Sequence, residues 1–179
     1  ILNGEGADTL SGGAGDDSLI AYSDAWDQLS NTLQGGAGND TLYGSFGEDT
    51  YLFNLGDGKD LIIERRDGED YTNIEASFDV LTFGEGISRA SLSFVRQGDD
   101  LLISLANGTD ALTVQNWFQE PTEHFKLDRI DFADGSSMTV DEIENSVRIL
   151  GTDAADQLLG YRDRSEQLVA DVMTKAVID

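Results

Sequence analysis

Aspartate at one fixed place in a glycine-rich pattern is the feature of this sequence with the clearest chemistry. The pattern G-G-x-G-x-D occurs at Gly12–Asp17 and again at Gly35–Asp40, and each copy continues into a short apolar stretch. In proteins, Ca²⁺ takes about six to eight oxygen ligands from carboxylates and carbonyls. Glycine permits positive φ angles, so the carbonyls of a tight turn can converge on an ion. The pattern therefore indicates oxygen sites for a hard divalent cation.

The pattern recurs with a period of nine residues along the first third of the chain. Copies begin at residues 3, 12, 35 and 44, and a looser fifth copy lies within Gly56–Ile62. The eighth position of each clear copy is apolar, and the alternation of side chains along a strand points that residue inward. Stacked copies would build a narrow core from these residues: Leu10, Leu19, Leu42 and Tyr51.

This nonapeptide resembles the calcium-binding repeat of RTX proteins, G-G-x-G-x-D-x-U-x with U a large apolar residue. The resemblance implies an all-β fold, a parallel β-roll over residues 1–62, in which Ca²⁺ lies between turns on the same side of the roll. The ligands of one ion would then come from copies i and i+2. Solvated turn aspartates without an ion are the alternative. By motif, the implied carboxylate ligands are Asp8, Asp17, Asp40, Asp49 and Asp60, and the implied carbonyl donors are Gly12, Gly35 and Gly44.

Residues 21–34 interrupt the glycine pattern and are interpreted as an insertion. Asp24 or Asp27 could complete a site with Asp8 across the roll, although neither stands in the motif. The role of these two aspartates is left open.

Residues 63–150 are predicted to form a β-rich flank. Apolar alternation broken at Gly98 and at Asn107-Gly108 predicts a three-stranded antiparallel meander that ends near Val114. The segment Thr139-x-x-Glu142 is a capping box. It predicts a short helix whose apolar face carries Ile143, Val147 and Leu150.

This flank resembles the haemolysin-type calcium-binding related domain that follows RTX blocks in large bacterial toxins and adhesins. The resemblance covers residues 53–148 and implies a cap over the exposed end of the roll. We expect Trp117 and Phe118 to cover that end, and a sugar-binding role for Trp117 is the alternative. The motifs that carry the resemblance are D-V-L-T-F at Asp79, D-L-L-I-S-L at Asp100, N-W-F at Asn116 and I-D-F-A-D-G at Ile130.

Residues 151–179 are predicted to begin a second unit and to end in a tail. The segment at Asp156 parallels that at Asp17, and Glu166 parallels Asp27 at the same offset. This long repeat indicates a tandem parent protein. The tail is interpreted as a helix or a strand-like cap, and a C-terminal secretion signal is an alternative.

Composition restricts the partners. The chain has 35 Asp and Glu against 11 Lys and Arg, a formal net charge of −24, which argues against nucleic acid and anionic membrane surfaces as partners and favours cations. The absence of cysteine excludes thiolate metal sites and leaves oxygen ligands for Ca²⁺. No apolar run approaches the roughly 18 residues of a transmembrane segment.

Catalysis is not expected. The only histidine is His124, in a loop, and no serine stands in a nucleophile-elbow context, so no catalytic residues are predicted and the chain is interpreted as a non-enzyme. The resemblance implies a secreted, extracellular module of a large toxin or adhesin that folds on Ca²⁺ after passing the type I secretion apparatus. Two alternatives stay open. One is a calcium-rigidified module of a cell-surface adhesin that binds a host-surface or glycan ligand, and the other is the C-terminal secretion module of a lipase or protease.

Overall fold

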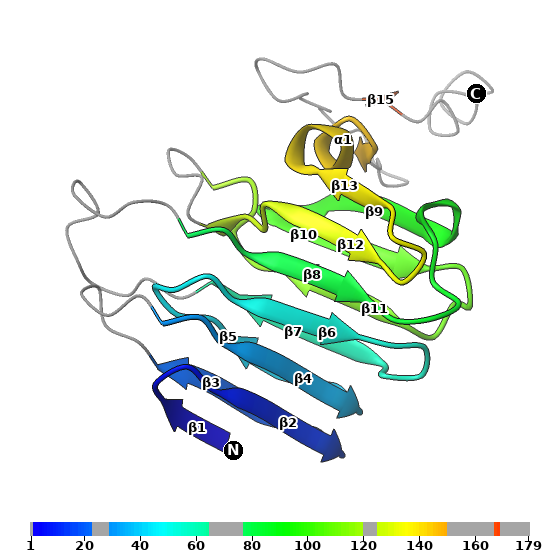
Figure 1. Cartoon of the computed structure of the whole chain (residues 1–179). Helices are drawn as coiled ribbons and strands as arrows, with labels where there is room; N and C mark the ends of the chain where they lie inside the picture. The colour runs from blue at the N-terminus through cyan, green and yellow to red at the C-terminus, as the bar shows by residue number, and fades with distance from the viewer. Residues whose placement is uncertain (1, 23–28, 65–76, 120–124, 150–166, 169–179) are drawn as a thin grey trace.

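The chain folds into two stacked β-sheets (Figure 1). The computed structural model describes residues 2–22, 29–64, 77–119, 125–149 and 167–168. One sheet has the order β1-β3-β5-β7-β11-β10-β9-β14-β15 and the other β13-β12-β8-β6-β4-β2. The strands are β1 (Leu2–Glu5), β2 (Thr9–Ala14), β3 (Ser18–Tyr22), β4 (Thr32–Ala37), β5 (Thr41–Tyr43), β6 (Thr50–Phe53), β7 (Lys59–Ile63), β8 (Val80–Phe83), β9 (Leu92–Gln97), β10 (Asp100–Leu105), β11 (Ala111–Val114), β12 (Arg129–Phe132), β13 (Ser137–Thr139), β14 (Val147–Ile149) and β15 (Gln167–Leu168).

Successive strands from β1 to β8 alternate between the two sheets. In the first sheet β1, β3, β5 and β7 pair in parallel, and in the second sheet β2, β4, β6 and β8 do the same. Each pass of the chain through both sheets is one coil, and copies two apart in the sequence become neighbours in a sheet. This arrangement confirms the predicted parallel β-roll.

The apolar residues at the eighth position of each copy form the core between the sheets. Leu19 lies opposite Leu42, and Leu42 opposite Ile62, in the first sheet. The second sheet aligns a matching row, Leu10, Leu33, Tyr51, Leu81 and Ile130. All but the partly buried Leu10 are fully buried, as side-chain alternation along a strand requires.

The segment interpreted as an insertion contributes a strand of the roll. β4 begins at Thr32, and Leu33 pairs with Leu10 on one side and with Tyr51 on the other. Asn31 and Leu33 occupy the sixth and eighth positions of a copy that would begin nine residues before Gly35 and that contains no glycine. The insertion interpretation was therefore wrong for the end of that segment.

The flank continues both sheets of the roll. β8 pairs in parallel with β6, and β12 with β8, while β11 pairs in parallel with β7. The predicted meander is confirmed, because β9, β10 and β11 are antiparallel neighbours. Its last strand, β11, is also the next parallel strand of the roll. The predicted boundary at residues 62 and 63 stays a prediction about sequence units, since both sheets run across it.

A short helix, α1 (Val140–Glu144), lies at the end of the roll opposite to β1 (Figure 1). The predicted capping box is confirmed, because Thr139 caps Glu142 N–H and the Glu142 carboxylate accepts from Thr139 N–H. The helix is shorter than predicted. Val147 begins β14, which pairs in parallel with β9, so strand pairing ends the helical face that Val147 was expected to share.

Trp117 and Phe118 are buried in the same apolar core. Complete burial of Trp117 contradicts the sugar-binding alternative, which needs an exposed ring face. The role of both residues in covering the end of the roll stays a prediction. The predicted second unit at residues 151–179 lies outside the described residues, apart from the backbone of β15, which pairs with β14. No helix in the described part of the chain is both long and apolar enough to cross a membrane.

Leu33→Ala tests whether the glycine-free copy is an integral part of the roll. Leu33 is fully buried between two paired strands, so its truncation should lower the free energy of unfolding in Ca²⁺ by about 2–5 kcal/mol. Leu55→Ala, at a side chain that is 50% exposed, is the matched control and should change it by less than about 1 kcal/mol. Urea unfolding followed by circular dichroism measures both, and equal effects would contradict this assignment.

Candidate metal sites

The sixth-position residues form a column along each edge where the chain passes between the sheets. On one edge, called the first ladder, Asp17 N–H donates to Asp40 Oδ1 at 2.6 Å and Asp40 N–H donates to Asp60 Oδ1 at 3.0 Å. Asp40 and Asp60 therefore each fix the backbone of the preceding coil. Asp110 lies on the same edge and accepts from Gly56 N–H at 2.6 Å.

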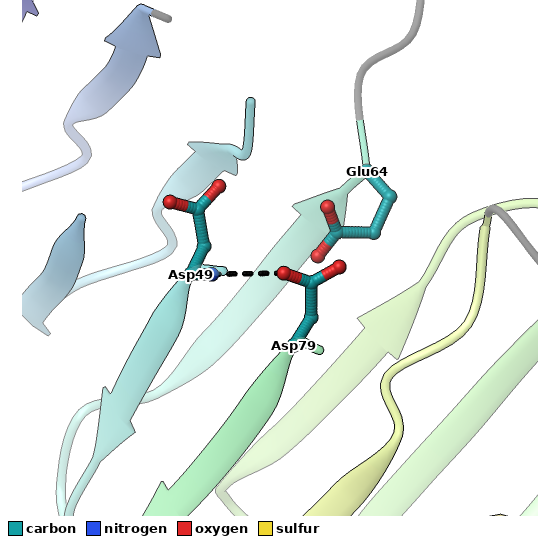
Figure 2. Close-up of side chains that lie close together, drawn as sticks. All are labelled: Asp49, Glu64 and Asp79. Atoms are coloured by element: carbon teal, nitrogen blue, oxygen red, sulfur yellow. Dashed lines mark hydrogen bonds between the residues drawn. The ribbon is translucent and has the colours of Figure 1, made fainter. Parts of the chain in front are cut away.

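The second ladder follows the other edge with the same geometry. Asp8 N–H donates to Asn31 Oδ1 at 3.1 Å, and Asn31 N–H donates to Asp49 Oδ1 at 3.0 Å. Asp49 N–H donates to Asp79 Oδ1 at 2.8 Å (Figure 2), and Asp79 N–H donates to Asp128 Oδ2 at 2.8 Å. The two ladders bring together the five aspartates predicted from the motif, with Asp17, Asp40 and Asp60 on one edge and Asp8 and Asp49 on the other.

Several ladder carboxylates have one oxygen without a hydrogen-bond partner. Oδ1 of Asp40 and of Asp60 accepts a backbone N–H, whereas Oδ2 of each is buried and has no partner, as has Oδ2 of Asp8. A buried carboxylate oxygen without a partner is costly, and an oxygen-seeking cation removes that cost. These residues therefore fit Ca²⁺, which coordinates carboxylate oxygens from adjacent chain segments.

The pKa values show the same electrostatic problem. Burial raises the pKa of Asp60 to about 7, and the nearby charges of Asp40, Asp57 and Asp110 act in the same direction, whereas the hydrogen bond from Asp40 N–H opposes it. Burial also raises the pKa of Asp40, with Asp17 and Asp16 adding to the effect. In the absence of a cation, Asp40 and Asp60 therefore hold their protons more tightly than free aspartate does.

Glycine at the first motif position is required by close packing against the ladder. A Cβ on Gly35 would collide with the Asp40 carboxylate, and a Cβ on Gly12 would lie 2.6 Å from the Gly35 carbonyl oxygen. Gly13 and Gly36, in the same two turns, each have a φ of 95°, which L side chains rarely adopt. The Gly35 carbonyl thus lies against the turn of the neighbouring coil, and the donor role of Gly12, Gly35 and Gly44 stays a prediction.

Asn31 is the ladder residue next to Asp8. Asp24 and Asp27, either of which could complete a site with Asp8 by sequence, lie outside the described residues. The Asn31 amide also donates to Asp49 Oδ1 at 2.9 Å and to Ser45 Oγ at 3.0 Å. An amide in place of a carboxylate lowers the negative charge of the second ladder at this coil.

Asn31 and three aspartates of the flank were missed by the motif. They carry one remaining signal, because each is followed two residues later by a fully buried apolar residue, as in the glycine-rich copies. That spacing of two, without any glycine, could have identified Asn31, Asp79, Asp110 and Asp128.

Parallel coils with aspartates stacked along both edges and buried unpartnered oxygens define a calcium-binding β-roll. The RTX calcium-binding nonapeptide repeat family matches residues 3–25 and 27–62, and the haemolysin-type calcium binding protein related domain matches residues 100–142. The chain therefore contains RTX calcium-binding nonapeptide repeats and, after them, a haemolysin-type calcium binding protein related domain.

Two similar proteins are much longer than this chain. The iron-regulated protein FrpA of Neisseria meningitidis serogroup C is 34% identical over 117 residues, which cover 65% of this chain and 10% of that protein. RTX-I toxin determinant A of Actinobacillus pleuropneumoniae is 31% identical over 107 residues, 53% of this chain and 10% of the toxin. The chain thus spans about a tenth of the length of these relatives.

Acidification should stabilise the metal-free fold. The pKa values of Asp60 and Asp79 are about 7 in the folded chain, far above the ordinary aspartate value, so the folded state binds more protons than the unfolded state between about pH 4 and 7. The free energy of unfolding should therefore fall as the pH rises through this window, by up to about 1.4 kcal/mol per pH unit for each group that titrates. Far-UV circular dichroism of the chain in chelator, from pH 4.5 to 7.5, measures it as a fall in the folded fraction.

Asp60→Asn is the control for this pH dependence. The amide mimics the protonated acid, so the variant should be more stable than the parent at pH 7.5 without metal and should show a shallower pH slope. A parent chain whose metal-free stability rises with pH over this range would show that the ladder carboxylates do not behave as buried acids.

Proposed function

We propose that this chain is a calcium-dependent folding module of a large secreted toxin or adhesin. The observation that carries the proposal is the set of buried ladder oxygens without a partner, Oδ2 of Asp8, Asp40 and Asp60. The metal-free roll buries carboxylates that it does not neutralise, so folding and ion binding become one event. The role proposed is non-catalytic.

Net charge supports such a switch. A chain with a formal charge of −24 resists collapse where Ca²⁺ is scarce, as in a bacterial cytosol. Each Ca²⁺ bound between coils brings two positive charges to a column of aspartates and stabilises only the folded state. We infer that the chain passes the type I secretion apparatus expanded and folds in the calcium-rich medium outside the cell.

A calcium titration followed by far-UV circular dichroism tests the proposal. Metal-free chain at pH 7.5 should give a largely unfolded spectrum that becomes β-rich cooperatively as Ca²⁺ is added, whereas Mg²⁺ should not substitute, because it keeps its waters and prefers octahedral sites. A chain that is already fully folded in chelator would contradict the folding switch and leave Ca²⁺ as a local staple.

Asp40→Asn should raise the Ca²⁺ midpoint of this transition by roughly tenfold or more, about 1.4 kcal/mol, because it removes a charged ligand at the centre of the first ladder. Asp99→Asn changes charge equally at an exposed turn outside both ladders and is the matched control. Equal midpoints for the two variants would contradict a ligand role for Asp40.

An adhesin module rigidified by Ca²⁺ is the second candidate, and a secretion module of a lipase or protease is the third. An adhesin module should retain a glycan or a host-surface protein in an array experiment with Ca²⁺ present, whereas a folding module should retain none. The similarity to a protein named as a toxin determinant favours the toxin setting over both alternatives.

A further inference from the structure

A cluster of three buried carboxylates lies where the glycine-rich copies end. One carboxylate oxygen from each of Asp49, Glu64 and Asp79 lies within 4.8 Å of the other two (Figure 2). Asp49 precedes β6, Asp79 precedes β8 in the same sheet, and Glu64 follows β7 in the other sheet. All three side chains are at most 3% exposed. The cluster thus joins both sheets at the edge of the second ladder.

The hydrogen bonds that Asp49 and Asp79 accept do not neutralise their negative charges. Asp49 accepts from Asn31 and from Ser45, and Asp79 accepts from Asp49 N–H and from the Ser77 hydroxyl at 2.8 Å. These donors carry no charge. Both carboxylates are buried, so water solvates their negative charges poorly. A cation bound between these carboxylates would offset the repulsion between their negative charges.

The Tyr51 hydroxyl is a second, independent indication of a ligand. Tyr51 is fully buried, and its hydroxyl lies within the cluster without a well-directed hydrogen bond to any partner. A Cβ built on Gly44 would collide with this hydroxyl and would lie 2.5 Å from Glu64 Oε2 and 3.2 Å from Asp49 Oδ2, so the hydroxyl and both carboxylates face the same small space. A phenolic hydroxyl can offer an oxygen lone pair to a cation.

We propose that Asp49, Glu64, Asp79 and the Tyr51 hydroxyl form a further divalent-cation site of the calcium type. Its donors are all oxygen atoms, which favours Ca²⁺ over Zn²⁺. The site shares Asp49 with the motif-predicted ligands, whereas Glu64 and Asp79 lie outside the nonapeptide copies and are not predicted by the motif. The ion would connect the two ends of the segment between β7 and β8 and tie the flank to the roll. The proposal rests on the proposed function only for the identity of the ion.

Counting bound ions tests the site. Equilibrium dialysis with Ca²⁺ at saturation, on chains shown to be folded by circular dichroism, should give one ion fewer for Glu64→Gln than for the parent. Glu48→Gln, at an exposed position in the turn before Asp49, is the matched control and should keep the parental count. Asp40→Asn, on the first ladder, reports the turn sites separately.

The outcomes separate the two proposals. A parental ion count and affinity for Glu64→Gln, with an ion lost from Asp40→Asn, would overturn this site and leave the proposed function standing. Unchanged counts for both variants would overturn both.

Tb³⁺ luminescence keeps the test decisive if Glu64→Gln does not fold. Tyrosine-excited emission of bound Tb³⁺ should fall severalfold in Tyr51→Phe and stay near the parental level in Tyr43→Phe, a tyrosine on the other sheet. Equal emission from the two variants would overturn the proposal.

Discussion

Stacking carboxylates along two edges is the constraint on which the rest of this structure depends. Asp40, Asp60 and Asp79 each accept the backbone N–H of the preceding coil, so the side chains that fix the spacing of the coils also place negative charges in a column. The core between the sheets is narrow, since few side chains of each short strand point inward. Burial of the core must therefore overcome the repulsion between the stacked carboxylates along both edges. Cations bound to the carboxylate oxygens turn this repulsion into a net attraction.

The flank follows the same constraint without the glycines. Asp79 and Asp128 extend the second ladder. Along the same sheet, Phe83 packs edge-to-face with Phe53 and stacks with Phe132, with ring centroids 5.9 and 5.8 Å apart. The meander and α1 widen the core with Trp117 and Ile143. In the flank, apolar contacts hold adjacent strands together, as the aspartate-bearing turns do in the repeats. One pair of sheets can therefore contain both the repeats and the flank, although their sequences differ.

The roll could be predicted because glycine, aspartate and the inward residue share one period. The same reasoning missed Asn31 and Leu33, where tertiary pairing preserves the coil although the turn has lost its glycines. The helical spacing from Ile143 to Val147 predicted a longer helix than α1, because spacing along the chain cannot show that β9 offers a free edge to Val147. Glu64 could not be assigned either, since its neighbours come from another sheet and from beyond residues 65–76.

The position of the carboxylate cluster bears on how the two sequence families fold together. Affinity for Ca²⁺ rises with the number of charged ligands, and so does the repulsion that must be overcome without the ion. A turn site built on single aspartates of adjacent coils stabilises the repeats alone, whereas the ion proposed between Asp49, Glu64 and Asp79 would link the last repeat to the first strand of the flank. Binding there favours only conformations in which β6, β7 and β8 are all in place. Calcium would then make the roll and the flank a single cooperative unit, and the continuous sheets across their boundary are the structural condition for that coupling.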